Sequence, residues 1–223
     1  DSGFVKCVFP LFAAEPAITA TLSREHPDAV PRILNVDSAR GLMQMEELPI
    51  ADVAAADAGP VLRTLAEIQR AWAGRADELL ALGAQDRRRE LPKAPLPDTL
   101  VHGDFHGGNA TLRRGDAVIF DWSDACIAQP LFDLHLFLCF VDAESERGRL
   151  VEAYAEGWSG VASVDEIHAA LELAAPYSCL HQAESYRAIT AAVEPDDRWW
   201  FGGEEQIWRE RADQARGNAA RPG

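Results

Sequence analysis

The pattern of apolar residues changes near Leu48-Pro49, and this change constrains the fold more than any other feature of the chain. Before it, short apolar runs of strand-like character cover residues 3–9, 31–36 and 41–45. One stretch between them, Pro16 to Leu22, has helical spacing. After the change, apolar residues recur every three or four positions, as in Val61, Leu65, Ile68 and Trp72. The sequence therefore predicts an α+β protein, with a small sheet and one helix over residues 1–47 and a mainly helical domain over residues 48–223.

Further helices are expected beyond the middle of the chain. Apolar residues share one helical face after Pro130, and the run from Ser163 to Glu166 is a capping-box pattern that begins another helix. A proline often occupies the first turn of a helix, so Pro176 predicts one more helix start. The residues of the expected face after Pro130 are Leu131, Leu134, Leu138 and Val141.

Three other segments have a predicted environment. Residues 87–97 are charged and rich in proline, so we expect a loop in which Arg87, Arg88 and Arg89 face solvent, although they could bind phosphate. The last ten residues are expected to be frayed. A cluster of aromatic residues near the end of the chain is expected to pack in the core or between lobes. Its members are Trp199, Trp200, Phe201 and Trp208.

Composition narrows the possible partners and the cellular compartment. The 223 residues include 36 acidic and 21 basic side chains, a net charge of −15 that disfavours binding to nucleic acid or anionic lipid. This charge suits a cationic substrate or serves solubility. The four cysteines are scattered in apolar neighbourhoods without CxxC spacing, which is typical of a reducing compartment. No apolar run is long enough to span a membrane and none resembles a signal peptide, so we expect a soluble cytoplasmic protein.

A β-hairpin is expected between residues 110 and 120. Strand-like runs flank Arg114-Gly115-Asp116, a three-residue turn in which glycine can adopt a left-handed conformation. Centring the hairpin on Gly115 pairs Leu112 with Val118 and Ala110 with Phe120. It thereby places Asn109 opposite Asp121 at the open end.

Three polar side chains near this hairpin suggest phosphoryl transfer. Asn109 and Asp121 would supply two oxygen ligands to Mg²⁺, and Asp104, on a loop flanked by glycine, could accept a hydroxyl proton. Asp104 and Asn109 also have the kinase spacing D-x-x-x-x-N. Taken singly, Asp104 is better explained as a turn residue, Asn109 as a cap and Asp121 as a strand end. The three together favour phosphoryl transfer. A rival hypothesis is a metallohydrolase-like metal triad of His102, Asp104 and His106, but the glycines between them favour a loop over a strand.

The segments HGDFHGGN, residues 102–109, and FDW, residues 120–122, resemble the signature of aminoglycoside phosphotransferases and their choline, homoserine and methylthioribose kinase relatives. The resemblance implies a two-lobed fold of the protein-kinase-like superfamily that uses ATP and Mg²⁺. It implies that Asp104 is the catalytic base, that Asn109 and Asp121 bind Mg²⁺, and that His102 organises the loop. The hairpin and the catalytic loop would belong to the helical C-terminal lobe.

The resemblance also extends to residues 1–47 as the nucleotide-binding lobe. Lys6 is similar to the lysine that contacts the α- and β-phosphates, with Glu15 as its ion-pair partner, and the run Met45-Glu46-Glu47 is similar to the hinge that holds adenine. Asp133, after Pro130, is similar to the stretch that follows the DW motif. Three features depart from the family: Glu15 starts its helix, the interval from Gly83 to HGD is short, and the two strands and Gly-rich loop expected before Lys6 are not in the sequence.

The acceptor is expected between Asp104 and the C-terminal helices. Acidic residues and one histidine there suit a small hydroxyl-bearing and cationic molecule, such as an aminoglycoside, although choline or homoserine is also compatible. The candidate residues are Asp124, Asp142, Glu144, His181 and Glu184. A noncatalytic, kinase-like binding protein is the alternative function. The sequence does not distinguish ATP from GTP, nor does it indicate the oligomeric state.

Overall fold

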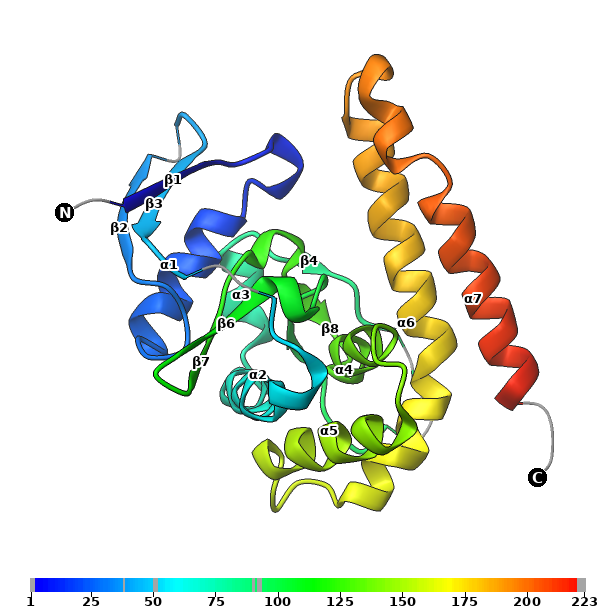
Figure 1. Ribbon diagram of the computed structural model, residues 1–223. Coiled ribbons are helices and arrows are strands. Elements are labelled where there is room, and N and C mark those ends of the chain that lie inside the picture. Colours follow the sequence, from blue (N-terminus) through cyan, green and yellow to red (C-terminus); the bar gives the residue numbers. More distant parts are fainter. Residues whose placement is uncertain (1–2, 38, 50–51, 90, 92–93, 220–223) are drawn as a thin grey trace.

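The computed structural model describes residues 3–37, 39–49, 52–89, 91 and 94–219. A small sheet with one helix lies beside a larger helical body, and two long antiparallel helices, α6 and α7, run along the side of that body (Figure 1). The mixed α+β architecture expected from the change near Leu48-Pro49 is therefore present.

The N-terminal sheet has three antiparallel strands in the order β1-β3-β2. The strands are β1 (Gly3–Cys7), β2 (Ile33–Asp37) and β3 (Leu42–Glu46). A short 3-10 turn, η1 (Pro10–Phe12), leads from β1 into α1 (Glu15–Glu25), where Pro16 occupies the first turn. All four predicted elements of this region are confirmed, with boundaries that differ by a few residues. Val8, Met43 and Met45 form its small core.

The remainder of the chain is mainly helical, with two small sheets near its centre. Its helices are η2 (Ala55–Asp57), α2 (Gly59–Ala71), α3 (Ala76–Ala81), η3 (Gly107–Asn109), η4 (Trp122–Asp124), α4 (Leu131–Leu138), α5 (Glu144–Gly157), α6 (Val164–Ala192), η5 (Pro195–Phe201) and α7 (Glu204–Ala219). One sheet has the order β4-β8-β5, formed by β4 (Gln85–Asp86), β8 (Cys126–Ala128) and β5 (Thr99–Val101). The other is the hairpin of β6 (Ala110–Arg113) and β7 (Asp116–Ile119).

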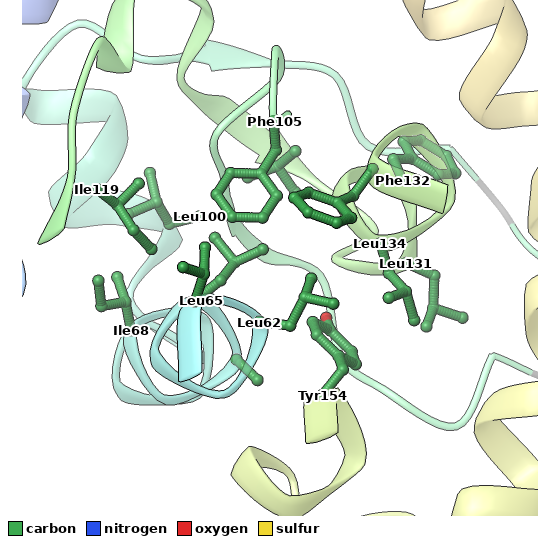
Figure 2. Close-up of a cluster of buried hydrophobic side chains, with 14 of the residues drawn as sticks. Leu62, Leu65, Ile68, Leu100, Phe105, Ile119, Leu131, Phe132, Leu134 and Tyr154 are labelled. Atoms are coloured by element: carbon green, nitrogen blue, oxygen red, sulfur yellow. The ribbon is translucent and has the colours of Figure 1, made fainter. Parts of the chain in front are cut away.

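The main hydrophobic core forms where α2 packs against the two small sheets and against α4 and α5. Leu62, Leu65 and Ile68 of α2 face Leu100 of β5 and Ile119 of β7 (Figure 2). All four residues of the predicted α2 stripe, Val61, Leu65, Ile68 and Trp72, are buried, as are the four predicted after Pro130. Burying each large side chain contributes about 1.5–3 kcal/mol, so this core holds β5 and the hairpin in fixed positions.

Helix α6 differs from the prediction at Pro176. The capping box of Ser163 and Glu166 begins the helix as expected, but Pro176 lies inside it and no new helix starts there. An internal proline costs about 3 kcal/mol in an isolated helix. The buried packing of α6 against α4 and α7 outweighs this cost, and a local pattern cannot show such packing.

The C-terminal aromatic residues have two different environments. Trp208 is buried, as predicted, against Cys179 and Ala183 of α6. Trp199 and Trp200 were expected in a core, yet they are 67% and 68% exposed and stack on each other. They lie on η5, the turn between α6 and α7, which projects beyond the rest of the chain (Figure 1). The predicted fraying is also wrong for part of the C-terminus, because α7 continues to Ala219; residues 220–223 lie outside the described residues.

Two further features of the fold are the state of the cysteines and the apolar character of the helices. All four cysteines are free; Cys126 and Cys179 are buried, whereas Cys7 is exposed and so lacks the apolar packing expected for it. Within the described ranges, no helix combines the length and apolar character needed to cross a membrane.

Candidate active site

The loop that follows β5 carries Asp104 and is held from behind by Asp133 of α4. The Asp133 carboxylate accepts hydrogen bonds from the backbone N–H groups of His102 and Gly103, at 2.7 and 3.0 Å, and from the Gln69 side chain at 2.9 Å. Burial raises the pKa of Asp133 to about 7, although these three donors oppose the rise. The Gln182 side chain of α6 donates to the Gly103 carbonyl oxygen at 2.5 Å. The loop is thus fixed on both sides by buried polar contacts.

Gly103 is required by the shape of this loop. Its φ angle is +88°, and a Cβ atom there would lie 2.4 Å from the carbonyl oxygen of Asp124. Only glycine avoids both the left-handed strain and the overlap. The loop conformation predicted from the glycines, rather than a regular strand, is confirmed.

His102 is part of the loop's internal support. Its ring is fully buried; Nε2 donates to the Phe120 carbonyl oxygen at 2.9 Å, and Nδ1 accepts from the Asp104 N–H at 3.4 Å. Burial lowers the pKa of His102. With both ring nitrogens engaged, His102 links the loop to the end of the hairpin. In the described part of the chain, no group of three His, Cys, Asp or Glu side chains is suited to a metal ion, which contradicts the rival triad of His102, Asp104 and His106.

Asp104 presents its carboxylate at the surface of the loop. The side chain is 42% exposed, and the Nε2 atom of His106 lies 3.8 Å from Asp104 Oδ2. The Asp104 carbonyl oxygen accepts from the Asn109 amide nitrogen at 2.8 Å. The backbone of Asp104 is therefore fixed while its carboxylate faces outward.

The hairpin has a different register from the predicted one. Ala110 pairs with Ile119 and Arg113 with Asp116, so the turn consists of Arg114 and Gly115 only. Both turn residues have positive φ angles, 57° and 95°, as in the tight two-residue turns that match strand twist. Asn109 consequently lies opposite Phe120, whose N–H donates to the Asn109 carbonyl oxygen at 3.0 Å, and not opposite Asp121.

Asp121 still emerges at the open end of the hairpin, one residue after this contact. Its backbone is left-handed, with φ 62° and ψ 58°, and its side chain is 43% exposed. The Lys6 ammonium group of β1 lies 2.7 Å from Asp121 Oδ1 and 2.6 Å from Glu15 Oε1. The predicted ion pair between Lys6 and Glu15 is therefore present, and Lys6 joins it to Asp121.

These three charges perturb one another. Burial alone would lower the pKa of Lys6, but Asp121 and Glu15 raise it above its usual value. Burial would raise the pKa of Asp121, and Lys6 holds it below its usual value. The pKa of Glu15, whose side chain is 1% exposed, is raised by burial despite Lys6. Lys6 and Asp121 are thus held in their charged forms.

The predicted hinge residues end the central strand of the N-terminal sheet. Met45 is buried in β3 between Phe4 and Ile33. The Glu46 N–H donates a hydrogen bond to the Arg32 carbonyl oxygen at 2.9 Å. The Glu46 carboxylate accepts one from Arg113 of the hairpin at 3.0 Å. Glu47 follows the strand and is exposed.

The predicted acceptor-pocket residues are dispersed. Asp124 is adjacent to the Asp104 loop, and burial together with nearby Asp104 raises its pKa to about 6. His181 is 1% exposed, so the structure contradicts its expected place on a pocket wall. Asp142 is exposed on the loop before α5.

Glu144 lines a separate cavity of about 580 Å³ between α4, α5 and α6, together with His135, Arg147 and His168.

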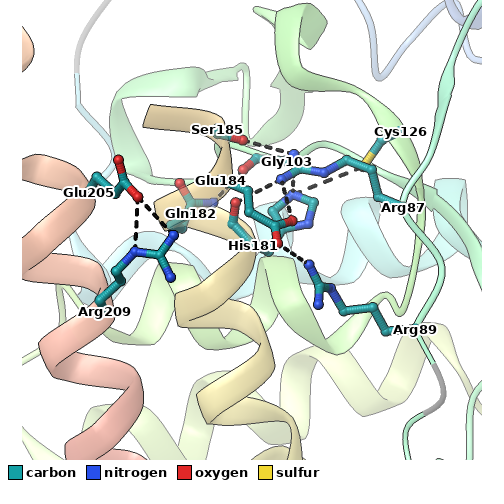
Figure 3. A network of polar contacts seen from close by, with 10 residues as sticks. All are labelled: Arg87, Arg89, Gly103, Cys126, His181, Gln182, Glu184, Ser185, Glu205 and Arg209. Carbon is teal, nitrogen blue, oxygen red and sulfur yellow. Dashed lines mark hydrogen bonds and ion pairs between the residues drawn. The ribbon is translucent and has the colours of Figure 1, made fainter. Parts of the chain in front are cut away.

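Arg87 and Arg89 contact α6 rather than solvent, contrary to the prediction. Arg87 donates to the Ser185 hydroxyl and to the His181 carbonyl oxygen, both at 2.8 Å, while Arg89 pairs with Glu184 (Figure 3). Only Arg88, paired with Asp86, has the expected exposed position. Arg87 and Asp124 line a small cavity of about 150 Å³ beside η1.

The sequence predicted neither the buried contacts of Gln69 and Gln182 nor the contact of Arg87 with α6. Each acts through a partner at least 64 positions away along the chain. A polar residue on an otherwise apolar helix face is the only local signal, and Gln69 carries it among the buried residues of α2.

Comparison with known proteins gives one family match. The sequence profile described as "Phosphotransferase enzyme family" matches residues 1–171. A search of curated protein sequences finds no match.

Solved structures give several similar folds. The choline/ethanolamine kinase family protein from Mesorhizobium loti is 18% identical with a TM-score of 0.55, over 95% of this chain and 81% of that one. The macrolide 2′-phosphotransferase from Brachybacterium faecium is 16% identical with a TM-score of 0.59, over 87% and 78% of the two chains. Aminoglycoside 2′-phosphotransferase-IIIa in its GDP complex is 13% identical with a TM-score of 0.58, over 93% and 83%. The α+β, protein-kinase-like fold expected from the HGD and DW motifs is confirmed.

Proposed function

The chain belongs to the phosphotransferase enzyme family, and we propose that it transfers the terminal phosphate of ATP to a hydroxyl group of a small, cationic molecule. One observation carries the proposal. Asp104 has an outward carboxylate, and its backbone carbonyl oxygen accepts a hydrogen bond from the Asn109 side chain. Asn109 lies opposite Phe120 in the hairpin, and the next residue, Asp121, contacts Lys6. A base, two oxygen ligands and a phosphate-binding cation would then be linked by one short series of contacts.

On the nucleotide side, Lys6 would contact the phosphates, with Glu15 holding it in place. Lys6 is 23% exposed, and its ammonium group contacts both the buried Glu15 and the partly exposed Asp121. The run Met45-Glu46-Glu47 would receive the base. Since the Glu46 N–H already bonds Arg32, Glu47 is the member of this run that best suits a nucleotide contact. Residues 1–47 would then be the nucleotide-binding lobe.

The residues present fit a magnesium ion in their donor chemistry. Because the Asn109 amide nitrogen donates to Asp104, the amide oxygen is the atom left for a ligand, and hard cations prefer oxygen. The Asp121 carboxylate already faces a cation, the Lys6 ammonium group. When bound there, Mg²⁺ would neutralise the negative charge that develops on the phosphoryl group and the leaving oxygen.

The transfer itself needs little covalent participation from the protein. The acceptor oxygen forms a bond to the terminal phosphorus, and the bond from that phosphorus to the bridging oxygen breaks, so nucleoside diphosphate leaves with the electron pair. The proton of the acceptor hydroxyl passes to the Asp104 carboxylate. Asp133 and Gln182 hold the Asp104 loop at the required place through the neighbouring backbone of Gly103.

The acceptor class is inferred from charge. Asp124 and Asp104 lie close enough to raise the pKa of Asp124, and the whole chain carries a net charge of −15. Two neighbouring carboxyl groups favour a ligand that brings positive charge. Aminoglycosides, macrolides and choline, which appear in the names of similar proteins, all carry a cationic nitrogen. A small amino-bearing alcohol of this kind is the proposed acceptor.

A rate measurement on Asp104 variants tests the function. We expect ATP consumption that depends on a cationic acceptor from a panel of aminoglycosides, macrolides and amino alcohols, with GTP compared as donor. Asp104→Asn should lower the turnover number by about 10²- to 10⁴-fold, because a general base contributes about that much. Asp116→Asn, the same change at an exposed position of the hairpin, should leave the turnover number unchanged.

Two outcomes would contradict the proposal. Undiminished turnover in the Asp104→Asn variant would remove Asp104 as the base. Binding of Mg-ATP without consumption, whichever acceptor is present, would instead favour the noncatalytic binding protein.

A further inference from the structure

We propose that His106 is a positioning residue, which orients the Asp104 carboxylate to receive the proton of the acceptor. The inference rests on the function proposed above, in which Asp104 is the base. His106 is neither one of the proposed metal ligands nor one of the proposed nucleotide contacts, so the proposed function leaves its side chain without a role.

The hydrogen bonds of the His106 ring determine its tautomer. The backbone N–H of Gly108 donates to Nδ1 of His106 at 3.0 Å, so Nδ1 is the unprotonated nitrogen of the neutral ring. The ring hydrogen is therefore on Nε2. This is the nitrogen that lies 3.8 Å from Asp104 Oδ2, and so the single N–H donor of the ring belongs to the nitrogen beside the carboxylate.

The ring is held in this position from two sides. A Cβ atom on Gly108 would lie 2.9 Å from His106 Cε1, so the ring packs directly on glycine backbone. On another side, the Phe140 ring meets it edge-on at a centroid distance of 6.0 Å. A donor whose own orientation is fixed loses little entropy when it forms a further hydrogen bond.

The Asp104 carboxylate has no comparable support. Its backbone is fixed by His102 and Asn109, yet none of the described residues donates a hydrogen bond to its side-chain oxygens. The carboxylate is 42% exposed, so fixing its orientation costs side-chain entropy unless another group holds it. The distance of 3.8 Å is longer than a hydrogen bond, but a small rotation of Asp104 closes it, and such contacts tighten when substrates bind. With Oδ2 held by His106, Oδ1 is left for the hydroxyl proton.

Two substitutions separate this role from a purely structural one. In His106→Asn, the amide oxygen can replace Nδ1 as the acceptor for Gly108, but no donor reaches Asp104. In His106→Gln, the longer side chain places an N–H near the former Nε2 position and gives up the bond to Gly108. If His106 positions Asp104, His106→Gln should be more active than His106→Asn. If His106 only supports the loop, His106→Asn should be the more active variant.

The experiment compares kcat and KM of both variants with the wild type, using Mg-ATP and the best acceptor of the panel. We expect His106→Asn to lower kcat by about 10- to 100-fold, because misplacing a reacting group costs about that much. His106→Gln should recover kcat to within about fivefold of wild type on the same basis. The KM values for ATP and acceptor should change little, since His106 acts through Asp104 and binds neither.

Every other pattern overturns the inference. Equal loss in the two variants, unchanged activity in both, or a greater loss in His106→Gln would assign His106 to loop support or to no role. If either variant fails to fold, His106→Ala assayed with added imidazole decides: recovery of kcat supports the role, and no recovery removes it. If transfer is lost in Asp104→Asn but not in His106→Asn, the proposed function stands without this inference. A wild type inactive with every acceptor would remove both.

Discussion

Asp124 is a carboxyl group that folding withdraws from water next to the proposed base. Burial is the main reason that its pKa rises from 3.8 to about 6, and the Asp104 charge adds to the rise, while Arg87 and the Ser185 hydroxyl oppose it. The backbone of Asp124 packs on Gly103, so this residue is close to the loop that carries Asp104. Its titration should therefore be visible in the stability of the protein.

The sign of the effect follows from proton binding. The folded state binds the Asp124 proton more tightly than the unfolded state does, so this group favours folding at low pH and the contribution is lost as pH rises from about 4 to about 6. A shift of about two pKa units corresponds to about 3 kcal/mol. In Asp124→Asn the side chain at this position has no titratable group. The free energy of unfolding of this variant, relative to wild type, should therefore increase by up to about 3 kcal/mol between pH 4 and pH 7.

Urea unfolding at four pH values between 4 and 7 measures this difference. Asp196→Asn, at an exposed position of η5, is the control for the substitution itself. A difference between Asp124→Asn and wild type that stays constant with pH would show that Asp124 ionises equally in both states.

Residues of the candidate site differed in how far the sequence could predict them. Asp104, Asn109 and Asp121 lie within one short segment, so their proximity follows from a loop and a hairpin. The pairing of Lys6 with Glu15 came from a family resemblance. Gln182 and Arg87 could not be predicted, because their partners are set by where α6 lies in the tertiary structure.

Helices α2 and α5 approach each other closely at Gly157. A Cβ atom there would lie 2.5 Å from the Ala66 Cβ and 2.9 Å from the Arg63 carbonyl oxygen, both on α2. Gly148 is in the same helix, yet no atom lies within 4 Å of the corresponding position. One helix thus contains a glycine that packing requires and one that packing does not.

Alanine substitutions at these two glycines should have opposite effects on stability. Gly157→Ala should lower the free energy of unfolding by about 1–3 kcal/mol, the usual cost of inserting a methyl group into a packed interface. Gly148→Ala should raise it by up to about 1 kcal/mol, because alanine favours the helix more than glycine does. Urea unfolding of the two variants beside wild type measures both. Changes of the same sign in the two variants would contradict the close packing of α2 on α5.

At the scale of elements, the sequence predicted helices α1, α2, α4 and α6 and the strands of the N-terminal sheet and the hairpin, but not their limits. It singled out neither α3, α5 and α7 nor the β4-β8-β5 sheet. The hairpin register was wrong by one residue because a turn with Arg114 in a left-handed conformation is uncommon for a residue with a side chain. Pro176 suggested a helix start because proline usually marks one, whereas tertiary packing carries α6 through it. In both cases a local preference was outweighed by contacts that the sequence does not display.

Lys6 connects the N-terminal sheet to the helical part of the molecule. It lies on β1, yet its ammonium group bonds Glu15 of α1 and Asp121 beyond the hairpin. Glu46 and Arg113 form a second contact between the same two regions, 3.0 Å long. If nucleotide and metal bind as proposed, they take over the Lys6–Asp121 contact. Binding should then stabilise the whole molecule and depend on Lys6.

Mg-ATP at about 100 times its dissociation constant should raise Tm by about 5–10 °C, because binding at that level adds about 2.7 kcal/mol to a domain of this size. Adding EDTA should remove most of the rise. Lys6→Met should abolish it. This variant also leaves Glu15 buried without its cation, which lowers Tm before any ligand is added, so the quantity to compare is the rise in Tm within each variant. Arg40→Met removes one positive charge from the exposed turn between β2 and β3 and should keep the full rise. An equal rise in Lys6→Met and Arg40→Met would mean that nucleotide binds without Lys6, and the contact between β1 and Asp121 would then be structural only.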